Sequence, residues 1–374
     1  MPDKKHASWS ELFYDLPYVA GLAVILNILG SNLSLDGFQT FLTFFIPLAW
    51  AWAGSTFYGD RFLTDHKSHK LMSLFEVVGI SFMAIFASGG SIGFQGFAYS
   101  YIFIRLILIL KYFKAGIKFK EAKPLAHTYA KGFLIGLIPW FLIISQTEFV
   151  LQLIVLGLIL DGITSAFASR HNKLRPLNET HLPERMGLFY IIVLGQVING
   201  LIRIETTTGI TFETMLGSMA GLVLAFSLWW LYFENIDGSV IGSSRGTLRQ
   251  AWSYVHLPFV LGIVLFGLGA QKAISSIPYS VLGSVEIVFL SISLAASIFC
   301  LGLFELITEY KNKTRRLKAL IRFIGSAVIL SIGWLMVITN PLYLIVLFTL
   351  ICIGIMVIDE LIVKKIIIFS LSSF

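Results

Sequence analysis

The distribution of lysine and arginine constrains this chain more than any other feature of its sequence. These cations gather in every second gap between long apolar runs, while the intervening gaps hold at most a single Arg203 or Lys272. Lys and Arg are retained on the cytoplasmic side and so orient membrane spans. The alternation predicts a polytopic membrane protein with both termini in the cytoplasm. The cationic gaps hold, in chain order, Lys4 and Lys5; Arg61, Lys67 and Lys70; Lys111 to Lys123; Arg170 to Arg185; Arg245 and Arg249; Lys311 to Arg322; and Lys364 and Lys365.

Composition indicates that lipid is the solvent for most of the chain. The 374 residues are 56% hydrophobic and 13% charged, with a mean hydropathy of +0.83. Soluble domains contain about 25% charged residues, so this fraction is low. The net charge of +7 falls along one predicted membrane face, where it meets anionic headgroups. The expected partner is therefore the lipid bilayer, and nucleic-acid binding is disfavoured.

The chain contains about twelve apolar runs of the length that a membrane-spanning helix needs, which is about 20 residues. The expected fold is an all-α integral membrane protein with about twelve transmembrane helices. The predicted spans are 8–29, 38–57, 71–88, 94–113, 125–145, 148–168, 183–202, 212–233, 251–270, 283–306, 320–339 and 342–363.

The first two spans resemble the seventh and eighth, which suggests an internal duplication. Glu11 precedes a Leu-Phe-Tyr run, and so does Glu184; Tyr58 and Asp60 correspond to Tyr232 and Glu234 at the same spacing. An offset of six spans preserves orientation and predicts a 6+6 parallel repeat. Chance similarity among apolar segments is the alternative. We expect a first six-span half over 1–168, a cytoplasmic connecting loop over 169–182 and a second six-span half over 183–374.

Ionisable side chains inside the predicted spans concentrate in the first half. Five of them lie roughly 7–12 Å from the cytoplasmic end of their helices, at about 1.5 Å per residue. They form a candidate polar cavity made of Asp15, Glu76, Arg105, Lys131 and Asp161.

Two interpretations of this charged band are open. It is either a cavity that binds an ion, a proton or a small polar solute, or a structural network of ion pairs. Both lead us to expect Arg105 within ion-pairing reach of an acidic side chain, because an unpaired charge in hydrocarbon is costly. In the second half His256 is the clearest ionisable residue at depth, with Glu286 and Glu305 nearer the ends. We therefore expect the second half to serve mainly for packing.

Motifs for cofactors and metals are missing from the sequence. It has no phosphate-binding glycine loop, no His-Glu-x-x-His segment and no Gly-x-Ser-x-Gly segment, which disfavours the corresponding enzymes. Cys300 and Cys352 lie in apolar runs and predict neither a disulfide framework nor a metal knuckle. His66 and His69 have the spacing of a metal pair, although a solvated loop is the more usual role for such residues. We expect no cofactor and no metal.

Two signature-like stretches resemble the bacterial low-temperature-requirement A family. The first is Trp9-Ser-Glu11-Leu-Phe-Tyr-Asp15-Leu, and the second runs from His181-Leu-Pro-Glu184-Arg185 to Leu-Gly195. An aromatic run, Trp229 to Phe233, follows in the same order as in the family. The family usually has an acidic residue after the final Leu-Gly, whereas this chain has Gln196. The resemblance implies a many-spanned protein of the bacterial cell membrane with a link to growth in the cold, and it implies no particular reaction.

The sequence favours a transporter-like protein whose first half moves a proton, an ion or a small polar solute. The alternative is a membrane-embedded enzyme that modifies lipids through His181, Glu184 and Arg185 at the inner interface. A third possibility is a non-catalytic membrane factor. The expected partners are the bilayer and a small polar solute or a proton, and the patterns specify no oligomeric state.

Overall fold

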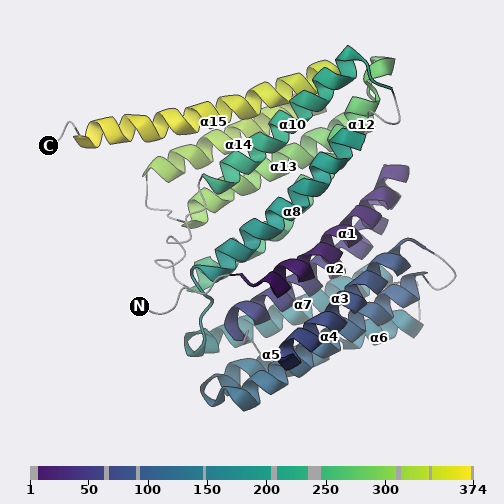
Figure 1. The fold of residues 1–374 in the computed structure, drawn as a ribbon, viewed down its shortest axis with the longest axis vertical. Helices are drawn as coiled ribbons and strands as arrows, with labels where there is room; N and C mark the ends of the chain where they lie inside the picture. The colour runs from purple at the N-terminus through teal and green to yellow at the C-terminus, as the bar shows by residue number, and fades with distance from the viewer. Residues whose placement is uncertain are drawn as a thin grey trace. The chain divides into compact units, whose positions relative to one another are not determined.

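The chain folds into long helices that carry the predicted spans (Figure 1). This computed structural model describes residues 7–62, 67–89, 93–145, 149–203, 209–234, 246–308, 313–336 and 339–371. Within these ranges every regular element is helical, and twelve helices are long and apolar enough to cross a membrane. The prediction of an all-α protein with about twelve spans is therefore confirmed.

The helices follow the predicted runs with small shifts at their ends. Three short 3-10 turns connect or extend them: η1 Lys120–Ala122, η2 Ser169–Leu174 and η3 Ile277–Tyr279. The α-helices are α1 Trp9–Ser31, α2 Leu35–Phe62, α3 Lys67–Ala87, α4 Gly93–Lys118, α5 Lys123–Gly136, α6 Ile138–Ser145, α7 Val150–Ala168, α8 His181–Arg203, α10 Phe212–Phe233, α12 Gly246–Ser275, α13 Ser284–Thr308, α14 Lys313–Trp334 and α15 Pro341–Leu371.

Some charged residues counted among the gaps between apolar runs, or just beyond a run, lie within helices. Asp60 and Arg61 lie in the last turn of α2, Lys111 lies inside α4 and Arg322 lies inside α14. All four side chains are buried. An apolar window detects only lipid-compatible sequence, whereas the helix persists wherever neighbouring helices supply partners for charged side chains.

The predicted fifth span is broken in its middle into α5 and α6. Pro139 lies in the first turn of α6 and has no backbone N–H with which to continue the ladder of α5. The N–H of Leu137 still donates to the carbonyl of Phe133, and the N–H of Trp140 then donates to the carbonyl of Leu137, only three residues earlier. The break occurs next to Gly136, one of the two glycines that bring α5 against α7.

Gly132 and Gly136 allow this close approach. A Cβ atom at position 132 would overlap the side chain of Thr164, and one at position 136 would overlap Asp161. Both contacted residues belong to α7, so the two small residues let α5 and α7 approach closely.

The chain divides into two compact units, Met1–Arg185 and Met186–Phe374. In the first, α3 packs on α4, α4 on α5 and α5 on α7. In the second, α12 packs on α13, α13 on α14 and α10 on α15, which run alongside each other in Figure 1.

Large apolar side chains such as Phe103, Leu110, Ile292 and Leu350 remain exposed on the helix surfaces. A lipid environment accounts for such exposure.

Candidate functional site

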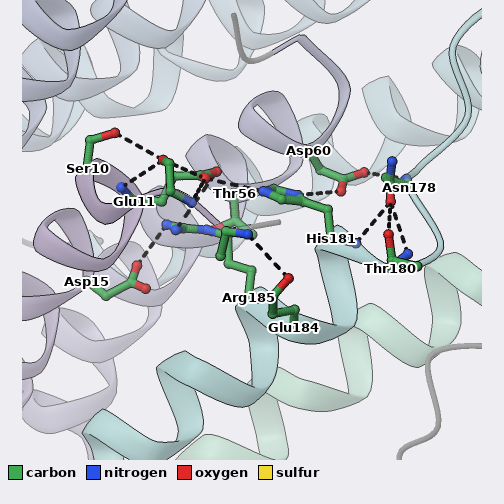
Figure 2. Close-up of polar contacts among 12 residues, drawn as sticks. Ser10, Glu11, Asp15, Thr56, Asp60, Asn178, Thr180, His181, Glu184 and Arg185 are labelled. Atoms are coloured by element: carbon green, nitrogen blue, oxygen red, sulfur yellow. Dashed lines mark hydrogen bonds and ion pairs between the residues drawn. The ribbon is translucent and has the colours of Figure 1, made fainter. Parts of the chain in front are cut away.

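The imidazole of His181, the first residue of α8, bridges two carboxylates of the first unit (Figure 2). Its Nδ1 lies 2.9 Å from Oδ1 of Asp60, at the end of α2, and its Nε2 lies 3.2 Å from Oε2 of Glu11, in the first turn of α1. The His181 side chain is fully buried, and both acidic residues are buried as well. Three helices therefore converge on one ring.

Hydrogen bonds from His181 to both Asp60 and Glu11 require one more proton than a neutral imidazole and two ionised carboxylates carry together. A neutral imidazole has one N–H and can donate to one carboxylate only. The second contact becomes a hydrogen bond when the ring is doubly protonated or when Glu11 or Asp60 carries a proton. The three side chains thus form a site that can hold one additional proton.

The connecting segment before α8 fixes the position of His181. The backbone N–H of Asn178 donates to Oδ2 of Asp60 at 2.7 Å, and Oδ1 of Asn178 accepts from the backbone N–H groups of Thr180 and His181. Asn178 therefore ties the first turn of α8 to the last turn of α2.

The segment expected to be a connecting loop also contains η2. Arg61 and Arg175 each donate from the guanidinium to the backbone carbonyl of the other.

Replacing Asn178 tests this positioning. We expect Asn178→Ala to lower the free energy of unfolding by about 1 kcal/mol, because two N–H groups at the start of α8 lose their acceptor. Asn178→Ser keeps a short acceptor and should lose less. Equilibrium unfolding in mixed micelles measures both, and a stability of Asn178→Ala equal to that of the wild type would show that the side-chain oxygen is unimportant.

Arg185, one turn after His181, joins the cluster to Asp15. Its Nη2 donates to Oδ1 of Asp15 at 2.8 Å, and Nε1 of Trp52 donates to the same oxygen at 2.8 Å. The Nη1 atom of Arg185 lies 4.0 Å from Oε1 of Glu11. Both of these atoms are buried, and neither has a hydrogen-bond partner among the described residues.

Arg185 and Glu11 both line a small pocket of about 30 Å³. The pocket is lined by residues of five helices: Ser10, Glu11, Tyr14, Ser55, Tyr58, Gly59, Ser73, Glu76, Lys111 and Arg185. On its far side Nζ of Lys111 donates to Oε2 of Glu76 at 2.6 Å, and Oγ of Ser55 donates to Oε1 at 3.2 Å. The pocket thus lies between two sets of buried charges.

A further ion pair lies deeper in the same unit. Arg105 donates to Oδ2 of Asp161 at 2.5 Å, and Nε1 of Trp50 donates to the same oxygen at 2.7 Å. The guanidinium also stands over the ring of Phe133 at 4.2 Å. The expectation that Arg105 pairs with an acid inside the bundle is confirmed. Along α4 the pair lies about 9 Å from Lys111, since six residues separate the two cations.

The structure groups the predicted cavity residues differently from a single band. Asp15 joins Arg185, Glu76 joins Lys111, and Arg105 joins Asp161. Lys131 is exposed on the surface of α5 and joins none of these three pairs. The side chain lies on the lipid- or solvent-facing side of its helix, which depth along the sequence cannot reveal.

The family-motif residues also separate into two sets. Glu11, Asp15, His181 and Arg185 come together in the buried cluster, whereas Trp9 is 87% exposed. Glu184 accepts a hydrogen bond from the backbone N–H of Ala7 at the edge of the cluster. Gly195 is exposed, and a Cβ atom there would meet no other atom within 4 Å.

Sequence reasoning missed Asp60, Lys111 and the two tryptophan donors, Trp50 and Trp52. Asp60 stands just beyond the predicted span 38–57, and Lys111 is counted among the cations between spans. The spacing of two tryptophans by two residues within an apolar helix was the available signal for indole donors, because a buried indole N–H needs an acceptor.

The second unit has its own buried charge network, which joins three of its helices, whereas the sequence alone indicates few charges at depth in this half. Arg322 donates from Nη2 to Oδ2 of Asp359 at 2.7 Å, and its Nη1 lies 3.2 Å from Oε1 of Glu305. Arg315 also pairs with Glu305 at 3.2 Å. Arg322 and Asp359 were overlooked because both stand at the ends of long apolar runs.

Both ring nitrogens of His256, in the second unit, face neutral groups. Its Nδ1 faces the carbonyl oxygen of Trp252 at 2.9 Å, and its Nε2 faces the hydroxyl of Tyr232 at 2.9 Å. A ring that donates from Nδ1 and accepts at Nε2 satisfies both contacts while neutral. His256 is as buried as His181 but lacks carboxylate partners, and this makes the two residues a natural comparison.

The described residues contain no group of three or more histidine, cysteine or acidic side chains suited to a metal ion. His66 and the side chain of His69, considered above as a metal pair, lie outside the described part of the chain.

Comparison with known proteins assigns the chain to a family. The family model "Bacterial low temperature requirement A protein (LtrA)" matches residues 6–357. The chain is also 25% identical over 310 residues to the uncharacterized protein RA0937 of Rhizobium meliloti (strain 1021), covering 74% of this chain and 71% of that protein. No solved structure matches. With nearly its whole length matched, this multi-pass membrane protein belongs to the bacterial low temperature requirement A protein family.

Proposed function

We propose that this protein translocates protons across the bacterial cell membrane, with Glu11, His181 and Asp60 as the proton-binding site. The observation that carries the proposal is the buried imidazole with a carboxylate oxygen at each ring nitrogen. Chains of acidic residues and histidine inside membrane proteins are typical of proton relays. Imidazole changes its charge near neutral pH and is the side chain best suited to this exchange.

Size favours a proton over an organic solute. The pocket beside the cluster has a volume of about 30 Å³, which accommodates about two water molecules. Binding sites for small organic molecules are about tenfold larger. An organic solute would need a wider cavity than the first unit provides around these residues.

A lipid-modifying enzyme is supported less well. That alternative assigns chemistry to His181, Glu184 and Arg185, and it requires a lipid headgroup to reach the imidazole. The ring of His181 is fully buried, and each of its nitrogens already faces a carboxylate.

Proton uptake into proteoliposomes tests the proposal. The purified full chain is reconstituted with a pH-sensitive dye inside the vesicles, and a potassium gradient with valinomycin supplies an inward driving force. We expect acidification well above that of protein-free vesicles, since the site would carry protons along the gradient. Equal rates with and without protein would contradict proton translocation and would favour a non-catalytic membrane factor.

We further propose that both termini are cytoplasmic, as the alternation of cations indicates. Single cysteines test this orientation at two exposed positions, Leu174 before α8 and Tyr279 between α12 and α13. In intact cells an impermeant thiol reagent should label Tyr279→Cys and spare Leu174→Cys. Native Cys300 and Cys352 are buried and give a low background. Labelling at Leu174 alone would reverse the topology.

A further inference from the structure

We propose that the pocket in the first unit binds water and links the Glu11 cluster to the Glu76–Lys111 pair, making Glu76 a second proton-holding group. This inference rests on the proposed function and extends it from one site to a route between two sites. It is carried by unpartnered polar atoms, by the dimensions of the pocket and by the balance of charge around it.

The unpartnered atoms call for a ligand that both donates and accepts a hydrogen bond. Nη1 of Arg185 is a donor and Oε1 of Glu11 is an acceptor; both atoms are buried, and both residues line the pocket. They lie 4.0 Å apart, which is too far for a direct hydrogen bond and close enough for one bridging molecule. Water accepts from the guanidinium and donates to the carboxylate, whereas a metal cation or an anion could satisfy only one of them.

Charge around the pocket also favours a neutral ligand. Two acidic side chains, Glu11 and Glu76, and two basic ones, Arg185 and Lys111, line the pocket, and Arg185 also pairs with Asp15. A cation would approach two buried positive groups and an anion two buried negative groups. A volume of 30 Å³ holds about two waters, and both Glu11 and Glu76 line it.

The backbone leaves room for water beside Glu11. A Cβ atom at position 59 of α2 would lie 3.1 Å from Oε1 of Glu11 and would occupy this space.

In the proposed step an O–H bond of the Glu11 carboxyl breaks and its proton passes to the first of two waters. The second water gives a proton to Glu76. No other bond changes, and Arg185 and Lys111 keep their protons.

Two substitutions at one position separate the role of the water from the effect of added volume. Gly59→Ala places a methyl group beside Glu11 and should reduce proton flux in proteoliposomes at least about tenfold. Gly59→Ser adds similar volume but brings a hydroxyl that can donate and accept in place of one water, so it should retain flux within about threefold of the wild type. The matched control is Gly162→Ala on α7, where a Cβ atom meets nothing within 4 Å.

The outcomes distinguish this link from the proton-binding site itself. Wild-type flux in Gly59→Ala, or equal losses in Gly59→Ala and Gly59→Ser, would overturn the water link. In Gly59→Ala the ring nitrogens of His181 should still exchange protons with pH, as observed by ¹⁵N NMR, because the imidazole contacts are untouched. Absence of flux in the wild type would instead refute the proposed function.

Discussion

In proteoliposomes, His181→Gln is expected to reduce proton uptake to the rate of protein-free vesicles. The glutamine side chain can still donate to one carboxylate, but it cannot accept and release a proton near neutral pH. The contacts at 2.9 Å to Asp60 and 3.2 Å to Glu11 show that the ring joins these two acids directly. Flux should therefore stop even though the fold is retained.

His256→Gln is the matched control for this prediction. It changes an equally buried histidine that contacts a tyrosine hydroxyl and a carbonyl oxygen, with no carboxylate at either ring nitrogen. Its flux per folded molecule should stay close to the wild type, since a neutral ring satisfies those contacts. Equal flux in the two variants, or loss of flux in both, would remove the special role of His181.

Arg322→Met is expected to lower the free energy of unfolding by about 3–5 kcal/mol, because two buried carboxylates lose their shared cation. Arg322 has no exposed surface, pairs with Asp359 and Glu305, and donates to the carbonyl oxygen of Leu301. It thereby joins α13, α14 and α15. Reversible unfolding of the full chain in mixed micelles measures the change.

Two further variants identify the cause of this loss. Arg316→Met removes an exposed arginine from the same helix and should change stability by less than about 1 kcal/mol. Adding Glu305→Gln and Asp359→Asn to Arg322→Met removes the unpaired charges and should recover most of the stability. If the triple variant is as unstable as the single one, packing of the arginine side chain is the main contribution.

The architecture was largely predictable because a lipid environment imposes a simple rule on sequence. Apolar length identifies helices in hydrocarbon without any knowledge of their neighbours, so all twelve spans were found. The same rule fails where a helix continues among charged partners, as at Asp60 and Lys111. The break between α5 and α6 has a local signal in the sequence, which is Pro139. The 6+6 repeat and the domain boundaries drawn from it stay predictions.

The site was only partly predictable, because depth along a helix does not determine which way a side chain points. Asp15, Glu76 and Asp161 lie at similar depths but take different cationic partners, and Lys131 at the same depth is exposed. The family motifs supplied Glu11, His181 and Arg185, although only the fold shows that His181 contacts Glu11 and Asp60. Pairing across more than one hundred residues is set by helix packing, which periodicity alone does not specify.

The measurement that bears most directly on proton binding by His181 is ¹⁵N NMR of its imidazole in lipid bilayers. The full chain is labelled at histidine ring nitrogens, and the His181 signals are assigned by difference from His181→Gln. Between about pH 5 and about pH 9 we expect these signals to change from a ring protonated at both nitrogens to a ring protonated at one. Signals of a single protonation state, unchanged across that range, would contradict proton exchange at His181.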